Sequence, residues 1–160
     1  MRLLAGKARV TPLKRNTTPR SELSGLLALT RLLNSLWRGF PELPIRVSLM
    51  GDSECVTNAV EAEDVALNAW FDNRVTEIQE NMKKWEQDGA IVDKLHHWPT
   101  ASNPADIVTK GQGTFDDIKL GGFWQTGPKV LQQPRDVWPA SRDFKKGRDS
   151  IPMEIGRAHV

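Results

Sequence analysis

The stretch His96–Gly111, H-H-W-P-T-A-S-N-P-A-D-I-V-T-K-G, places a histidine pair, two prolines and a carboxylate beside a helix start. Asn103 is a favourable N-cap residue and Pro104 suits the first helical position, so Asp106 is expected in the first turn of a helix. The helix dipole and the free N–H groups there favour the charged carboxylate. Asp106 therefore either only stabilises the helix start or, with partner carboxylates, binds a metal ion.

The composition is that of a soluble domain. With 160 residues, of which 39% are hydrophobic and 26% charged, the chain can form one domain with a sizeable core. A net charge of +2 does not by itself indicate nucleic-acid binding, although a local basic patch would suffice. The single cysteine, Cys55, excludes a disulfide framework and is most simply a small core residue. Without a membrane span or a signal peptide, an intracellular location is expected.

Two elements are predicted before residue 40. Apolar residues among basic ones over Arg2–Leu13 predict a strand, which needs a neighbouring strand to pair with. Thr18 as N-cap and Pro19 at the first helical position then begin a helix, with Glu22 in its first turn. Leucines recur at spacings of three and four as far as Gly39, which indicates a buried amphipathic helix.

A second strand and a second carboxylate follow. Ile45–Met50 alternates apolar and polar residues, which predicts a strand with one buried face. It ends in Gly51–Ser53 and leads into a helical run, Glu54–Val60. A carboxylate just past a strand lies where open α/β sheets usually bind ligands, which favours Asp52 as a functional residue. The alternative is a turn aspartate that caps the next helix.

The later spacing completes an alternating pattern. Asn68–Glu86 is predicted as a long helix and Ile91–Trp98 as a short strand. The resulting order of strand, helix, strand, helix, helix, strand, helix predicts an α/β domain with helices packed on a mixed sheet over residues 1–111.

Residues 112–140 are rich in glycine and proline and are predicted to form an irregular extension. Trp124 and Trp138 would anchor it back onto the domain, with base stacking as an alternative role. Residues 141–153 are expected to form a disordered, charged tail. Residues 154–160 resemble a translated sequencing adapter and are excluded from fold reasoning.

Glu22, Asp52 and Asp106 stand in comparable settings, two near helix starts and one at a strand end. Magnesium prefers oxygen ligands and retains several waters, so a few carboxylates and substrate phosphate oxygens complete its shell. Two such ions can activate a water and stabilise the leaving oxygen in phosphodiester hydrolysis. A magnesium site therefore depends on whether the fold brings the three carboxylates together.

Five segments, P-R-S-E-L, G-D-S-E, N-R-V-T-E-I-Q-E, H-H-W-P-T-A-S-N-P-A-D-I-V-T-K-G and F-W-Q-T-G-P, resemble the Pao/BEL-type LTR retrotransposon polyprotein. The resemblance runs from about Ala5 to about Pro139 and covers the RNase H-like segment between reverse transcriptase and integrase. It implies an RNase H-like fold and, in the intact protein, two-metal hydrolysis of the RNA strand of RNA–DNA hybrids with Mg²⁺ or Mn²⁺.

The resemblance also assigns roles. It makes Glu22, Asp52 and Asp106 the metal-binding, catalytic carboxylates and makes His97 the mobile catalytic histidine that assists water activation or product release. The pKa of an unperturbed histidine is about 6.5, which suits either role. For His96 we expect only a strand residue without chemistry.

One departure from the family is important. The family's sheet begins with a central strand that carries the first metal-binding aspartate, followed by a second strand, and both would precede Arg2. We therefore expect an N-terminally truncated domain with unpaired strand edges. Such a fragment would be marginally stable and inactive on its own.

The resemblance implies an RNA–DNA hybrid as partner, together with the reverse transcriptase and integrase segments of the same polyprotein, and no membrane. The location would be a cytoplasmic particle or the nucleus. The alternative is a noncatalytic connection module that binds nucleic-acid phosphates. Its contact residues would be Lys7, Arg9, Lys14, Arg15 and Arg20. A remnant without any role is the third possibility.

Overall fold

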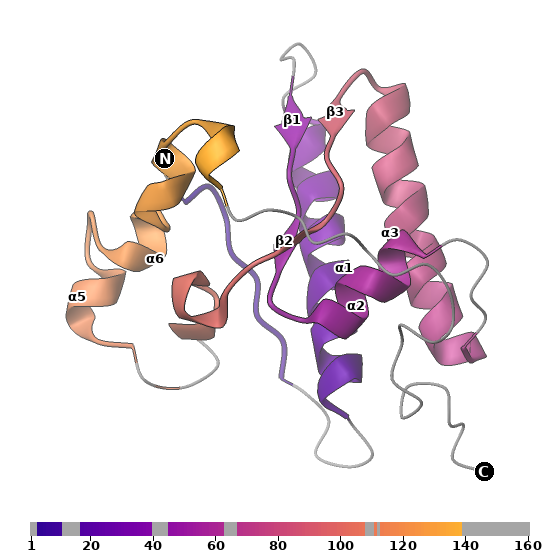
Figure 1. Cartoon of the computed structure of the whole chain (residues 1–160), viewed down its shortest axis with the longest axis horizontal. Helices are drawn as coiled ribbons and strands as arrows, with labels where there is room; N and C mark the ends of the chain where they lie inside the picture. The colour runs from indigo at the N-terminus through magenta and orange to yellow at the C-terminus, as the bar shows by residue number, and fades with distance from the viewer. Residues whose placement is uncertain are drawn as a thin grey trace.

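Helices alternate with short parallel strands in this chain, and short helical turns follow them (Figure 1). The computed structural model describes residues 3–10, 17–39, 45–62, 67–107, 111 and 113–138. Two long helices, α1 (Thr18–Trp37) and α3 (Ala69–Gln87), pack side by side against the strands, and α2 (Glu54–Glu61) lies beside them. The fold is therefore α/β, as predicted.

The strands form one parallel ribbon in two parts. Strand β1 (Arg46–Val47) pairs with β3 (Ile91–Val92), and β2 (Met50–Gly51) pairs with β4 (His96–His97). The N–H groups of Ile91, Asp93, His96 and Trp98 donate to the carbonyls of Ile45, Val47, Leu49 and Gly51 at 2.7–3.0 Å. Pairing therefore continues between the two parts. In the described part of the chain neither pair is joined by a third strand. Both pairs are parallel, whereas a mixed sheet was predicted.

The ribbon contains a bulge. Val47 pairs with Val92, and Met50 pairs with His96. The chain therefore advances four residues from Val92 to His96 but only three from Val47 to Met50. One additional residue lies between Val92 and His96, as in a β-bulge. Leu95 and Val92 consequently both pack in the core, although they are three positions apart.

The interface between α1 and α3 forms the centre of the core. Leu23, Ile78 and Trp85 have no exposed surface, and Trp37 stacks on Trp85 at 6.1 Å between ring centroids. Trp85 Nε1 donates to Asn34 Oδ1 at 2.6 Å, and Asn34 Nδ2 donates to Asn81 Oδ1 at 2.7 Å. These hydrogen bonds satisfy polar groups inside an otherwise apolar interface.

The two long helices run in the same direction. Arg31 contacts Glu77, Asn34 contacts Asn81, and Trp37 contacts Asp88, with sequence separations of 46, 47 and 51. A nearly constant separation requires parallel helices. Because α3 turns at Gly89 (φ 95°) into β3, both helices run opposite to the strands, and their N-terminal ends lie at the carboxyl ends of the strands (Figure 1).

The helices predicted to begin near residues 18, 54 and 68 are confirmed, with changes at their starts. The strands predicted over Ile45–Met50 and Ile91–Trp98 are also present, each divided into two short parts. The N-cap of α1 is Thr17 rather than Thr18, so Glu22 lies beyond the first turn and not within it. Ser53 is the N-cap of α2 and accepts a hydrogen bond from the Val56 N–H at 3.4 Å. The alternative role of Asp52 as the cap of this helix is therefore wrong.

The strand predicted over Arg2–Leu13 is wrong for residues 3–10, which contain no strand; residue 2 and residues 11–13 lie outside the described residues. Leu4 and Val10 are 68% and 98% exposed, and the Leu3 N–H donates to the Gln125 carbonyl at 2.7 Å. The segment thus runs along the extension instead of pairing with the ribbon. Its apolar residues gave a strand pattern, but among the described residues no strand pairs with it to bury them.

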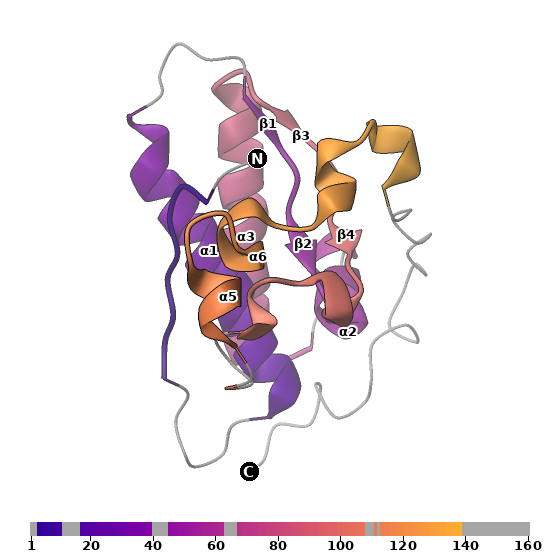
Figure 2. The same ribbon diagram turned by 90° about the vertical axis from the view of Figure 1, so that its left-hand side faces the viewer.

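The extension consists of short helical turns. They are η1 (Thr100–Ser102), α5 (Phe115–Ile118), α6 (Phe123–Thr126), η2 (Lys129–Gln132) and η3 (Arg135–Val137). Figure 2 shows η2 and η3 on the side of the strands away from α1 and α3. The predicted tail at 141–153 and the segment 154–160 lie outside the described residues. In the part of the chain that the structure describes, no helix is both long enough and apolar enough to cross a membrane.

Candidate active site at the carboxyl ends of the strands

The carboxyl ends of the ribbon bring Asp52 and His97 to the same edge. Gly51 is the register partner of His97, and the Trp98 N–H donates to the Gly51 carbonyl at 2.7 Å. Asp52 follows directly in a bend, and both side chains are partly buried. Among the described residues His97 Nδ1 is buried without a hydrogen-bond partner, as are both ring nitrogens of His96.

Glu22 approaches the same edge from α1. It lies near the N-terminal end of α1, which is located at the carboxyl ends of the strands. Burial raises the pKa of the Cys55 thiol, the Ser53 hydroxyl opposes this effect, and the charges of Glu22 and Glu54 add to the rise. Cys55 lies in the first turn of α2, three residues after Asp52, so the effect of the Glu22 charge on it indicates that this carboxylate lies near the strand ends.

The start of the helix at Asp106 has the predicted cap. Asn103 Oδ1 accepts from the Ala105 N–H at 3.1 Å, and the Asp106 N–H donates to the Asn103 carbonyl at 3.2 Å. Trp98, which is 2% exposed, donates through Nε1 to the Ser102 carbonyl at 3.0 Å. This bond ties the segment to the strand end. Asp106 and Ile107 are helical, and residues 108–110 lie outside the described residues.

The carboxylates do not form a complete ligand set. Glu22, Asp52, Asp106 and His97 all belong to the described residues, and within these no group of three or more His, Cys, Asp or Glu side chains could hold a metal ion. Carboxylate oxygens are the correct ligands for Mg²⁺, but the described residues by themselves do not gather three of them around one position.

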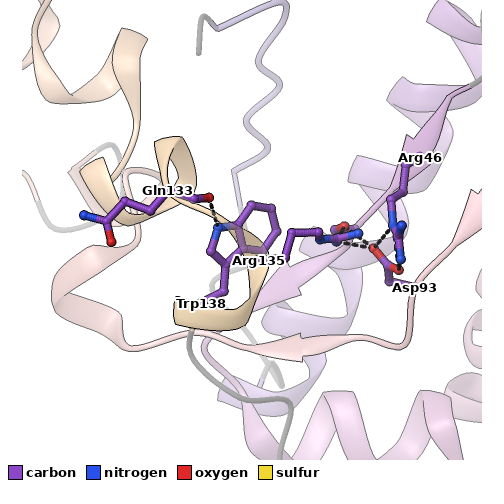
Figure 3. A network of polar contacts seen from close by, with 6 residues as sticks. Arg46, Asp93, Gln133, Arg135 and Trp138 are labelled. Atoms are coloured by element: carbon purple, nitrogen blue, oxygen red, sulfur yellow. Dashed lines mark hydrogen bonds and ion pairs between the residues drawn. The ribbon is translucent and has the colours of Figure 1, made fainter.

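A polar network that the sequence did not predict lies on the opposite face of the ribbon from the helices (Figure 3). Arg46 donates to Asp93 Oδ1 from Nη2 at 2.9 Å and from Nε at 3.1 Å. Ser48 and Arg135 also donate to Asp93, and Arg135 donates to Ser48 as well. Burial by itself raises the pKa of Asp93, but these three donors hold it well below its usual range. Asp93 is thus a charged anchor for η3.

The same network places an aromatic ring against His96. The Arg135 guanidinium lies 4.7 Å from the centroid of the Trp138 ring. The Trp138 and His96 rings meet in an edge-to-face arrangement, with their centroids 6.4 Å apart. Trp138 Nε1 donates to the Gln133 carbonyl at 3.1 Å (Figure 3). Burial lowers the pKa of His96, Asp93 opposes this effect and Arg135 adds to it. His96 therefore has a packing role, and Trp138 anchors the extension as expected.

Trp124 lies beside the N-terminal segment. A Cβ added at Gly6 would lie 3.5 Å from Trp124 Cζ2. This tryptophan therefore lies against the N-terminal segment, residues 3–10.

The residues proposed to contact nucleic acid are only partly described. Lys7 and Arg9 are exposed, and the Arg20 guanidinium lies 5.1 Å from the centroid of the Trp70 ring. Lys14 and Arg15 lie outside the described residues. Arg31 and Arg74, which belong to the same basic face, were not predicted, because their proximity depends on the parallel packing of α1 and α3.

In comparisons with known proteins, the chain matches no family model, no curated protein and no solved structure.

Proposed function

We propose that this chain is the RNase H-like segment of a Pao/BEL-type retrotransposon polyprotein. In the intact protein it would hydrolyse the RNA strand of RNA–DNA hybrids. The reverse transcriptase and integrase segments of the same polyprotein would be its neighbours, in a cytoplasmic particle or the nucleus. The five segments quoted above support the family, and the alternation of helices with parallel strands agrees with it.

The edge formed by Asp52 and His97 is the main structural support for hydrolysis. A carboxylate and an imidazole at the carboxyl ends of parallel strands are in the position where open α/β sheets commonly bind their ligands. Glu22 lies near this edge because α1 runs opposite to the strands. A histidine side chain can act as a general acid or base, which hydrolysis of a phosphodiester requires.

Magnesium, with manganese as an alternative, is the cofactor that the resemblance implies. Glu22, Asp52 and Asp106 would be the carboxylates that hold it, and the ion would supply charge stabilisation and an activated water. Further ligand oxygens would have to come from the substrate phosphate or from the rest of the polyprotein, since the described residues do not form a three-ligand group.

The first experiment tests metal binding by the 160-residue chain. Mn²⁺ is titrated into ¹⁵N-labelled protein, and line broadening of backbone amides is measured. We expect broadening centred on Asp52 and His97 that is strongly reduced in Asp52→Asn. The matched control is Glu80→Gln, which removes one exposed carboxylate from α3. Broadening that is equal in both variants would contradict the proposed metal site.

The second experiment tests hydrolysis in the polyprotein that contains this chain. An RNA–DNA hybrid labelled in its RNA strand is incubated with Mg²⁺. Asp52→Asn should abolish cleavage and leave hybrid binding largely intact. Unchanged cleavage by Asp52→Asn would overturn the assignment. Hybrid binding without any cleavage by the parent protein would instead favour a noncatalytic module or an inactive remnant.

A further inference from the structure

A groove of about 180 Å³ between α1 and α3 is lined mainly by basic and neutral polar side chains. Its charged and polar residues are Arg9, Arg31, Arg74, Glu77, Ser24 and Asn73. Arg31 and Glu22 are nine positions apart on α1, which is about two and a half turns, so they point to opposite sides of the helix. The groove is therefore separate from the edge that carries Asp52.

The charges in the groove are not balanced. Arg31 binds Glu77 through two hydrogen bonds, from Nε at 2.6 Å and from Nη2 at 2.7 Å, and this pair accounts for the single carboxylate. Within the described residues neither Arg74 nor Arg9 has an ion-pair partner. Partial burial lowers the pKa of Arg74, and the nearby positive charges of Arg31 and Arg20 lower it further against the opposing effect of Glu77. The groove thus has an excess of positive charge that favours an anion.

The orientation of the Arg74 guanidinium is fixed. Its Nη1 donates to the Trp70 carbonyl at 2.8 Å, and its Cζ lies 3.7 Å from the centroid of the Trp70 ring. Stacking on an aromatic ring restricts the plane of a guanidinium and leaves its remaining N–H donors directed outward. An arginine held in this way loses less entropy when it binds a phosphate.

The arginines form a row. Arg20 and Arg31 are eleven positions apart on α1, or about three turns, so they lie on one face of the helix and are separated by roughly 16 Å. Arg74 shares the Trp70 ring with Arg20 and lines the groove together with Arg31, so it lies close to both. In a nucleic-acid strand the rise is about 3.4 Å per nucleotide, so the row corresponds to roughly five nucleotides. Its length suits a polyanion better than a single phosphate.

We propose that the arginine row, formed by Arg20, Arg74 and Arg31 with Arg9 beside it, binds the phosphodiester backbone of a nucleic-acid strand. Bidentate guanidinium–phosphate contacts provide the affinity, and Leu27 and Ala28 form the apolar floor of the groove. Binding is independent of base sequence because only the backbone is contacted. This binding does not depend on the proposed hydrolysis, since it uses none of the carboxylates at the strand ends.

The test uses the 160-residue chain and a fluorescein-labelled 20-nucleotide DNA strand, with affinity measured by anisotropy over a range of salt concentrations. Arg74→Gln should weaken binding roughly tenfold and reduce the slope of log K against log salt by about 1. The matched control is Lys83→Gln, which makes the same charge change on the opposite side of α3, nine positions from Arg74. It should change the affinity less than about twofold.

A second variant guards against misfolding. Glu77→Gln removes the carboxylate that competes with a phosphate for Arg31 and should tighten binding several-fold. Equal losses in Arg74→Gln and Lys83→Gln would show that overall charge alone acts and would overturn the proposal. The proposal would also be overturned if poly-glutamate, or vesicles containing phosphatidylserine, displaced the labelled DNA as effectively as unlabelled DNA does. Asp52→Asn should leave this binding unchanged, which separates the row from the candidate active site.

Discussion

The α1–α3 interface and the contact between the extension and the ribbon hold their parts of the molecule by different means. The helices are joined by closely packed leucine, phenylalanine and tryptophan side chains and by hydrogen bonds between neutral groups. The extension is joined to the ribbon by a shared carboxylate, two arginines and the edge of one tryptophan ring. The first contact should therefore withstand changes of pH and salt, and the second should respond to both.

Trp85→Ala should cause the largest loss of stability. The side chain has no exposed surface, stacks on Trp37 and donates to Asn34, so its removal leaves a cavity and an unpaired acceptor. We expect a loss of about 3–5 kcal/mol in the free energy of unfolding, measured by urea denaturation. Phe115→Ala, at a position that is 76% exposed, should cost less than about 0.5 kcal/mol. Similar losses in both would contradict the central role of this interface.

Asp93→Asn should detach the extension without unfolding the helices. Arg46 and Arg135 would lose their shared negative charge, and the local cost is expected to be about 2 kcal/mol because both arginines are partly hydrated. Hydrogen exchange should then increase in residues 128–138 and remain unchanged in α3. Faster exchange in α3 to the same extent would show that the two regions unfold together.

Acidification should loosen the same contact more gently. The folded-state pKa of His96 is lowered by burial, so its packing against Trp138 is fully stable above the ordinary histidine pKa of about 6.5. It weakens as the pH falls below that value, because the unfolded state takes up the proton first. Asp93, whose pKa is also lowered, keeps its contribution until the pH approaches the ordinary aspartate value of about 4.

Hydrogen exchange of residues 128–138 between pH 5 and pH 7, corrected for the intrinsic rate, measures this effect. The pH dependence should disappear in His96→Leu. If it persists there, another group is responsible.

Glu77→Gln should have the smallest effect on stability. The ion pair that it breaks is on the surface, with 45% and 38% of the two side chains exposed, and such pairs contribute less than about 1 kcal/mol. Thermal unfolding at low and at high salt should give nearly the same value for the variant and the parent protein. A loss as large as that of Asp93→Asn would mean that burial does not decide the strength of these ion pairs.

The parts of the fold that follow a local rule were predictable from the sequence. Leucine and aromatic residues at spacings of three and four gave α1 and α3, and alternation gave the strand that ends before Asp52. Residues 3–10 have a similar apolar content but lie outside any sheet, since strand formation depends on a partner that the sequence does not show. The N-cap differed by one residue, because Thr17 and Thr18 are equally suitable caps.

The contacts between distant segments were not predictable. Arg135 and Asp93 are 42 residues apart, and Arg74 meets Arg31 only because α1 and α3 are parallel. Asp93 did give a signal, since a charged residue directly after Ile91 and Val92 in a strand is rarely buried without a partner. For the candidate active site, the sequence indicated Asp52 and His97, which the fold places at one edge. It could not indicate whether Glu22 and Asp106 complete the ligand set.

The bulge between Val92 and His96 sets the phase of the second strand. Side chains alternate between the two faces, so a single additional residue inverts every later position. It lets Asp93 and His96 face the extension while Leu95 enters the core. Without this bulge, a strict alternation that ran through Lys94 would exchange the faces of His96 and His97. The identity of the histidine at the strand ends is therefore determined by chain length at this one point as well as by the residues themselves.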